Sequence, residues 1–302
     1  MRVGLPRALL YFKYYPVLEQ LFRSNGWEPV VSTPTNKRKL EQGLALCEDE
    51  VCLPVKVMMG HVRSLAEQDI DALFVPRVVS LERKRYFCPK FLGLPDMVRC
   101  SLGNEIPLIS PTVNLSWSRL KIWQEGLKSC NCLKPWRWWL SLNSAARIHR
   151  RHLQAGEPVS PGGGKRVAVL GHCYNIYDEY VNFGLLNTLA QLGVTVLTVE
   201  NFTREQIEEG ARGLSKDLFW SYGRDVVGAA FYCLARGAAD GVILVASFGC
   251  GPDSLIIEII QQRFARFDIP LMCLTLDEHA ADTGLVTRVE AFVDMLNWRD
   301  VC

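Results

Sequence analysis

The chain has 302 residues, of which 49% are hydrophobic and 22% are charged, and its formal net charge is +2. This composition is typical of a soluble globular protein, and the near-neutral charge excludes a protein that binds nucleic acid or membranes through a strongly basic surface. The N-terminal stretch carries prolines at positions 6 and 16 and charges among its apolar residues. We therefore expect neither a signal peptide nor a spanning helix, and we predict a cytoplasmic protein.

Short apolar runs alternate with helical patterns along the first part of the chain. The run at 2–5 precedes an aromatic-rich helical stretch that ends at Gly26, and further apolar runs occupy 28–33, 72–80 and 105–110. Such alternation predicts a parallel sheet covered by helices. A length of 302 residues also exceeds what one compact core usually organises, so we expect two domains.

The alternation stops after the last of these runs and begins again at KRVAVLG, which starts at residue 165. Between them lie the tryptophan-rich stretch LKPWRWWLSL and the turn-rich SPGGGK, which indicate a connector and a linker. We predict a first α/β domain at 1–115, a helical connector and linker at 116–164, and a second α/β domain at 165–302.

The second α/β run repeats the first. Strand patterns and helix patterns follow in the same order, and IPL recurs close behind a cysteine in both halves. Four pairs of positions have nearly the same separation in sequence: Val3 and Val167, Gly26 and Gly193, Cys88 and Cys250, Ile106 and Ile269. Chance similarity between two α/β units is the alternative, but the shared cysteine favours an internal duplication with two Rossmann-like parallel-sheet domains.

The chain contains eleven cysteines, which is many for a cytoplasmic protein, where disulfides rarely persist. Cys233 and Cys273 lie in apolar runs, and we expect both to be packed as small hydrophobic side chains. Cys250 instead follows the apolar run DGVILVASF, and Cys88 follows ALFVPRVVS after a short charged loop. In open parallel sheets ligands bind beyond the carboxyl ends of the strands, so two facing domains would bring both thiols into one cleft.

Cys52, in CEDEVCLPVK, is a third candidate of the same kind. All three cysteines have a proline close behind, which we expect to end regular structure and to let the sulfur point into a cavity. Lys56 lies near Cys52 and Lys90 lies near Cys88, and the start of a predicted helix follows Cys250. These positive charges favour thiolates, the form of cysteine that binds metals.

The spacing of the cysteines bears on the kind of metal. A structural zinc site typically uses paired CxxC motifs, and the sequence contains none; the CNC at 130–132 is too tight for that pattern. An iron–sulfur cluster accepts cysteines far apart in sequence. Three widely spaced cysteines therefore favour a cluster over zinc.

Four segments, DEVCLPVKVMMGHV, RYFCPKFLGLPD, SFGCGPDS and LDEHAADTGLVTRVEAF, carry a family resemblance. In this order they resemble proteins related to acyl-CoA dehydratase activases and, more distantly, the iron–sulfur subunits of 2-hydroxyacyl-CoA dehydratases and benzoyl-CoA reductases. The resemblance implies two Rossmann-like domains around a cubane [4Fe–4S] cluster, or alternatively a double-cubane cluster, with Cys52, Cys88 and Cys250 as ligands. It also implies anaerobic, low-potential chemistry that a separate ATP-dependent activase drives.

Two further cysteines depart from the family pattern, and either would complete a cluster. Cys173 stands where relatives usually have proline, and Cys47 lies upstream of the matching motif. His61 and His279 are candidate cleft residues, although a core or solvated histidine is the commoner outcome. The GGGK at 162–165 lacks the spacing of a phosphate-binding loop and precedes a strand, so we interpret it as a linker.

Two interpretations of the function remain. In the first, the protein is a redox enzyme, a dehydratase-like component or an electron carrier that acts on an acyl-CoA-like small molecule with an activase as partner. In the second, it is a non-catalytic accessory or binding protein whose thiols are packed or store a cluster. The sequence leaves the substrate, the catalytic residues and a homodimeric state open.

Overall fold

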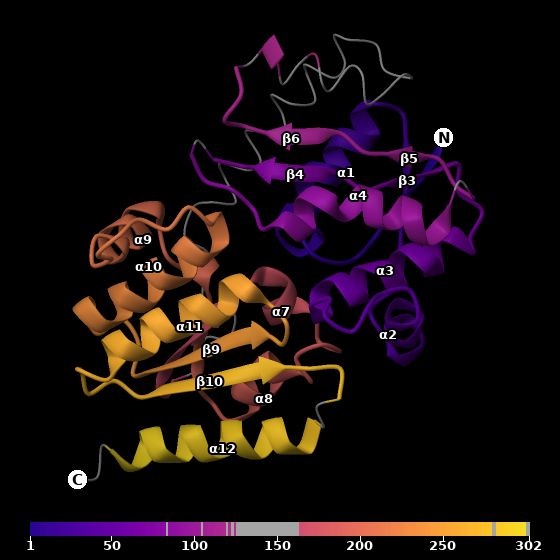
Figure 1. Ribbon diagram of the computed structural model, residues 1–302. Helices are drawn as coiled ribbons and strands as arrows, with labels where there is room; N and C mark the ends of the chain where they lie inside the picture. The colour runs from indigo at the N-terminus through magenta and orange to yellow at the C-terminus, as the bar shows by residue number, and fades with distance from the viewer. Residues whose placement is uncertain are drawn as a thin grey trace. The chain divides into compact units, whose positions relative to one another are not determined.

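The computed structural model describes residues 1–121 except 83, 104 and 119, residue 124, residues 163–279 and residues 282–299 (Figure 1). These residues form two compact units. The first contains the described residues up to 124 and also Phe219–Ser221, whose backbone hydrogen-bonds to Tyr86; the second contains the rest. Most of the predicted connector, with its tryptophan-rich stretch and the cysteines of the CNC motif, lies outside the described residues.

A parallel sheet with strand order β2-β1-β3-β5 forms the centre of the first unit. In β1, Val3 pairs with Pro29 of β2 on one side and with Ala72 of β3 on the other. Two further strands, β4 and β6, form a separate parallel pair. The strands are β1 (Arg2–Leu5), β2 (Glu28–Val31), β3 (Ala72–Phe74), β4 (Arg77–Ser80), β5 (Leu108–Ile109) and β6 (Thr112–Asn114).

The predicted strand at 72–80 is therefore two strands. β3 ends at Phe74, and β4 begins at Arg77 in the other sheet. Pro76 lies between them, and a proline has no N–H with which to continue a ladder. The chain consequently leaves the main sheet at this point.

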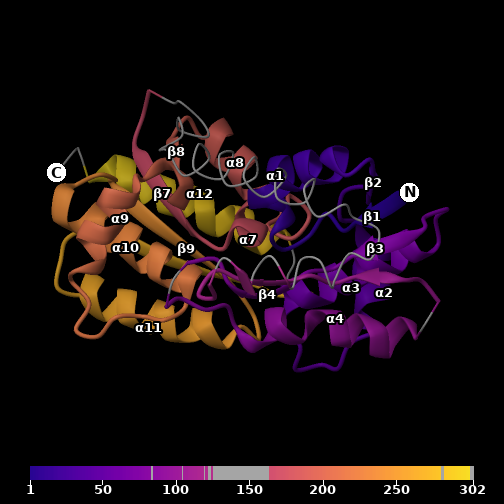
Figure 2. The same ribbon diagram turned by 90° about the horizontal axis from the view of Figure 1, so that it is seen from above.

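Helices cover both faces of this sheet, with α1 on one face and α3 and α4 on the other (Figure 2). Phe22 of α1 packs edge-on against Phe74 of β3 and against Trp27, with ring centroids 5.1 and 5.7 Å apart. These rings belong to the core of the unit. The helices are α1 (Tyr11–Ser24), α2 (Lys37–Leu44), α3 (Leu53–Ala66) and α4 (Pro89–Leu102).

Two glycines allow α2 and α3 to approach very closely. A Cβ at Gly60 would lie 1.8 Å from the carbonyl oxygen of Lys39, and a Cβ at Gly43 would lie 1.9 Å from that of Lys56. Neither position has room for any side chain. The contact fixes the position of α3, and therefore of Cys52 at its start, against α2.

The second unit is built on a parallel sheet with strand order β10-β9-β7-β8. In β7, Val167 pairs with Val196 of β8 and with Gly241 of β9. All seven residues of β9 are buried, as expected for a central strand of a sheet with two covered faces. The strands are β7 (Arg166–Gly171), β8 (Thr195–Leu197), β9 (Gly241–Ser247) and β10 (Leu271–Leu276).

Helices cover both faces of this sheet as well, with α9, α10 and α11 on one face and α8 and α12 on the other (Figures 1 and 2). A large apolar core lies between β7, β9 and the first group of helices. The elements are α7 (Cys173–Tyr177), α8 (Leu185–Gln191), the 3-10 helix Val199–Asn201, α9 (Arg204–Ala211), α10 (Ser221–Arg236), α11 (Gly251–Phe264) and α12 (Asp282–Trp298).

The two sheets have the same topology, since β1, β2, β3 and β5 take the places of β7, β8, β9 and β10. Gly26 and Gly193 each precede the second strand of their unit and have φ values of 71° and 74°, a conformation that favours glycine. The predicted α/β class with parallel sheets is confirmed. The shared strand order is what an internal duplication would produce. In the part of the chain that the structure describes, no helix is both long and apolar enough to span a membrane.

Candidate functional site

The three cysteines singled out from the sequence share one local position. Cys52, Cys88 and Cys250 are each the residue immediately before a helix, namely α3, α4 and α11. Each has an extended backbone, with ψ values of 147°, 159° and 103°, and each helix has proline as its first or second residue.

The prolines therefore start these helices, and the expectation that they end regular structure is wrong. Proline suits the first turn of a helix because the N–H that it lacks would have no partner within the helix there. A thiol in this place lies beside the unpaired N–H groups and the positive end of the helix dipole, which favour a thiolate. The local sequence thus places each of the three cysteines at the start of a helix.

Cys47 lies in the electrostatic environment of Cys52, within the first unit. Burial raises the pKa of the Cys47 thiol above its ordinary value, Cys52 raises it further, and the charges of Lys56 and Lys90 oppose this rise. Lys56 is buried, and its Nζ donates to the carbonyl oxygen of Asp49 at 3.1 Å. The structure therefore brings Cys52, Lys56 and Lys90 within electrostatic reach of Cys47.

In the second unit, Cys250 forms a compact group with two residues that the sequence did not indicate. A ring nitrogen of His172, the sulfur of Cys250 and a carboxylate oxygen of Asp253 lie within 4.8 Å of one another, and all three residues are buried. The Nε2 atom of His172 is 2.7 Å from Oδ1 of Asp253. We call this group the His172–Cys250–Asp253 site.

The parallel pairing of β7 with β9 produces this site. His172 follows β7 directly, Cys250 follows β9 after a short turn, and the last paired residues are Gly171 and Val245. A Cβ at Gly171 would lie 2.3 Å from the carbonyl oxygen of Val245, so only glycine permits this approach of the strands. His172 and Cys250 are thereby both held at the carboxyl edge of the sheet, where parallel α/β folds bind ligands.

A buried hydrogen-bond network supports the site. The backbone N–H of Ser247 donates to Oδ2 of Asp253 at 3.3 Å, and the Ser247 hydroxyl donates to Oδ1 of Asn175 at 2.7 Å. Two polar atoms of this region, Nδ1 of His172 and Nδ2 of Asn175, are buried without a hydrogen-bond partner among the described residues. The His172 ring also stacks on Tyr174, with centroids 5.1 Å apart.

The other singled-out residues have different surroundings. Cys173 is buried as the first residue of α7, directly after His172. Cys233 is completely buried in the core, which raises its pKa to about 12, and Cys273 packs against the same core, so both are packed side chains as predicted. His279 is exposed, and one of its ligand atoms lies within 4.8 Å of the carboxylates of Asp277 and Glu278.

His61 is a core histidine. Its ring is fully buried, with Nδ1 2.7 Å from the hydroxyl of Ser32 and Nε2 2.9 Å from that of Thr35. Burial, together with the charges of Lys39 and Arg7, lowers its pKa to about 3. The imidazole is therefore neutral, and both of its ring nitrogens have hydrogen-bond partners. These hydrogen bonds help to hold α3 against the segment after β2.

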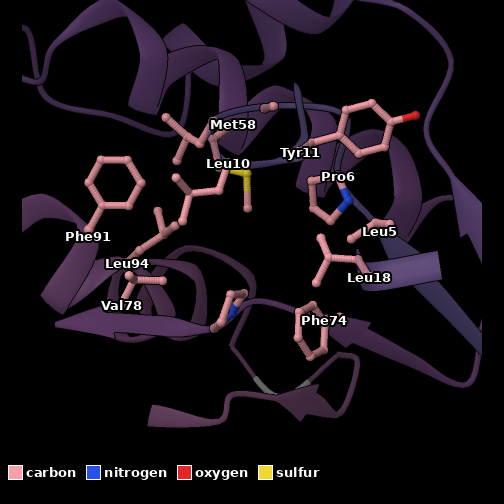
Figure 3. A pocket seen from close by; sticks show the side chains of 13 residues that line it. Leu5, Pro6, Leu10, Tyr11, Leu18, Met58, Phe74, Val78, Phe91 and Leu94 are labelled. Carbon is pink, nitrogen blue, oxygen red and sulfur yellow. The ribbon is translucent and has the colours of Figure 1, made fainter. Parts of the chain in front are cut away.

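The first unit also contains an apolar cavity of about 40 Å³ (Figure 3). Leu5 of β1, Phe74 of β3, Met58 of α3 and Phe91 of α4 contribute to its lining. The labelled Tyr11 directs its hydroxyl away from the other lining side chains in Figure 3. Since one water needs about 10–15 Å³ of such space, the cavity as it stands accepts only a few water-sized groups.

Two comparisons with known proteins bear on the family. The model of the family described as "CoA enzyme activase uncharacterised domain (DUF2229)" matches residues 2–202. This range includes Cys52, Cys88 and His172, whereas Cys250 and Asp253 follow it. No curated protein matches the chain.

Proposed function

Since the chain belongs to the family of the CoA enzyme activase domain, we propose that it is an iron–sulfur protein of acyl-CoA metabolism. In this role it transfers electrons at low potential, or takes part in the reduction or dehydration of an acyl-CoA-like substrate. We also propose that it is related to the iron–sulfur subunits of 2-hydroxyacyl-CoA dehydratases and benzoyl-CoA reductases. Its partner in this proposal is a separate activase that hydrolyses ATP.

The observation that carries the proposal is the common position of Cys52, Cys88 and Cys250 before proline-started helices. Cysteines that only pack in an apolar core are not expected to occur repeatedly at the start of a helix. Cys233, in the apolar core, illustrates the contrast because burial raises its pKa to about 12 and keeps it protonated.

The candidate residues are cysteines, which is the residue type that holds iron–sulfur clusters. Iron–sulfur clusters are held by cysteine thiolates, and their potential depends on charge, hydrogen bonds and solvent exposure around the sulfurs. We propose Cys52, Cys88 and Cys250 as the ligands, with Cys47 and Cys173 as the candidates for a fourth. When bound, a [4Fe–4S] or double-cubane cluster would accept and release single electrons. The protein would supply the thiolates and the positive helix ends that stabilise them.

The sequence supports a separate activase in this proposal. Neither GxGxxG nor GxxxxGK[ST] occurs in the chain, and the glycines before Lys165 lead into β7, whereas a phosphate-binding loop follows a strand. In this proposal the partner protein therefore hydrolyses ATP. An accessory protein of the same fold, with packed thiols or a stored cluster, is the competing candidate.

Anaerobic purification with iron and sulfide analysis tests the proposal. We expect a brown protein with comparable amounts of iron and acid-labile sulfide. We also expect its cluster to give a reduced electron paramagnetic resonance signal with ATP, a cognate activase and a reductant, but not with ATP alone. A colourless protein after anaerobic reconstitution would leave the packed-thiol interpretation. An equal signal with a mild reductant and no activase would indicate an ordinary electron carrier or a storage protein.

A further inference from the structure

The apolar cavity of the first unit lies where parallel α/β folds bind ligands. Leu5 and Pro6, at the end of β1, and Phe74 and Pro76, at the end of β3, contribute to its lining. β1 and β3 are neighbours, and the next strand of the sheet lies to one side after β1, as β2, and to the other side after β3, as β5. The cavity is therefore at a topological switch point, beyond the carboxyl ends of the strands.

The lining of the cavity selects for an apolar ligand. The described residues that line it include no charged and no amide side chain. Tyr11 is the lining residue with a polar group, and its hydroxyl is directed away from the other lining side chains (Figure 3). Because a polar group buried without a hydrogen-bond partner costs free energy, the space favours a hydrocarbon group.

The cavity is unfilled space in an otherwise packed unit. Leu9 and Met58 of its lining are buried, whereas Leu10 and Leu18 are partly exposed, so its wall on the side of α1 reaches the surface of the unit. Protein interiors have few voids larger than a water molecule, and an empty apolar cavity reduces stability. An apolar group from a ligand would remove this cost.

The segment that connects β1 to α1 supplies part of the lining and is held under strain. Leu9 has a φ value of 51°, in the left-handed region that leucine rarely adopts. A residue stays in such a conformation only where its surroundings enforce it, and residues of this kind gather at ligand sites. The strained leucine thus marks the same place as the strand ends.

We propose that this cavity binds a short alkyl group. Its volume of about 40 Å³ holds about three water-sized groups, which corresponds to an alkyl group of about two or three carbons. Met58 and Phe91 of the lining belong to α3 and α4, the helices that begin directly after Cys52 and Cys88. That the alkyl group is the acyl end of a thioester substrate rests on the proposed function.

Primary alcohols from ethanol to hexanol are the probes, added to the full chain labelled with ¹³C at its methionine methyl groups. We expect the nuclear magnetic resonance signal of Met58 to shift. The signal of Met59, which is buried beside it in the chain but does not line the cavity, should shift far less. Met58→Leu and Met59→Leu assign the two signals. The affinity measured at Met58 should rise about fourfold from ethanol to propanol and then level off.

Two leucines of α4 provide a matched pair of variants. Leu94 lines the cavity, and Leu94→Ala should raise the chain length at which the affinity levels off by up to about three carbons. Leu102 is buried in the same helix outside the lining, and Leu102→Ala should leave that chain length unchanged. The unsubstituted protein reports through Met58 even where a variant fails to fold. A Met58 signal that no alcohol shifts, or an affinity that rises steadily to hexanol, overturns the inference.

Thioesters separate this inference from the proposed function. Propionyl-CoA should displace propanol from the cavity, whereas CoA alone should not. If neither displaces it, the acyl assignment is overturned and the alkyl site stands. Propanol bound at Met58 in a protein that forms no cluster overturns the proposed function and leaves the site. A protein that carries a cluster, but in which no alcohol reaches Met58, has the reverse meaning.

Discussion

Cys88 and Cys250 hold equivalent positions in the two units: each immediately precedes the helix that leads to the edge strand of its sheet. Cys88 starts the connection through α4 to β5, and Cys250 starts the one through α11 to β10. In each sheet this edge strand pairs with the third strand of the unit, β3 or β9. The sequence pairing of these two cysteines therefore corresponds to a topological equivalence.

The position that Cys52, Cys88 and Cys250 share, immediately before a helix, predicts which cysteines bind a cluster. Cys52→Ala, Cys88→Ala and Cys250→Ala should each lose or convert the iron–sulfur cluster, because each removes a thiolate at a helix N-terminus. Iron and sulfide content with the visible spectrum of anaerobically purified protein measures this. Cys233→Ala and Cys273→Ala should retain the cluster at some cost in packing. Full iron retention in the Cys250 variant would contradict the ligand assignment.

The close contact of α2 and α3 predicts a second effect. In Gly60→Ala the new methyl group would lie 1.8 Å from a backbone oxygen of α2, so the helices must separate. We expect a loss of about 1–3 kcal/mol in the free energy of unfolding, as for an overpacked core, and an altered cluster at Cys52. Urea unfolding and the visible spectrum are the measurements.

Gly93→Ala in α4 is the matched control for that variant. A Cβ at Gly93 meets nothing within 4 Å, and alanine is the better helix former by about 1 kcal/mol. This variant should be as stable as the wild type or slightly more stable. Equal stability of the Gly60 and Gly93 variants would show that α2 and α3 do not pack as described.

His61 predicts a dependence of stability on pH. Its pKa is about 3 in the folded protein and 6.5 in the unfolded chain, so between these values the unfolded chain binds the extra proton. This contribution to stability is complete above pH 6.5 and falls as the pH drops toward 3. From pH 7 to pH 5 it should decrease by about 2 kcal/mol.

His61→Gln removes this titration and keeps a side chain that can hydrogen-bond to Ser32 or Thr35. The difference in unfolding free energy between wild type and variant should shrink by about 2 kcal/mol between pH 7 and pH 5, measured by urea unfolding at both values. All other titrating groups are common to both proteins and cancel. A difference that stays constant with pH would mean that the pKa of His61 in the folded protein equals its pKa in the unfolded chain.

Two arginine–glutamate pairs join α9 and α10, and we expect substitution of the two arginines to reduce stability to different extents. Arg224 is buried and binds Glu208 through two hydrogen bonds of 2.8 and 2.7 Å, whereas the side chain of Arg236, which binds Glu209, is 61% exposed. Arg224→Met should cost about 1–3 kcal/mol because it breaks charge-assisted hydrogen bonds of a buried group. Arg236→Met should cost less than about 1 kcal/mol. Thermal unfolding of the two variants makes the comparison, and equal losses would refute it.

Local patterns in the sequence determined the elements and their order. Alternating apolar runs and helical stretches indicated two parallel α/β halves, and Gly26 and Gly193 marked the same turn in both. The cysteine–proline pairs marked three places where extended chain meets a helix. The prediction that the prolines end regular structure was wrong, because they start the helices. These features depend on the conformational preferences of a few adjacent residues, so they can be derived from the sequence itself.

Only the tertiary structure decided which distant residues meet. His172 and Asp253 are far apart in the chain and become partners because β9 pairs with β7 in one register, which no short-range pattern encodes. His61, a cleft candidate by sequence, is instead enclosed with Ser32 and Thr35 because α3 packs on the segment after β2. Strand neighbours and buried faces follow from the burial of apolar surface over the whole unit. The environment of each side chain is therefore a property of the packed chain rather than of its local sequence.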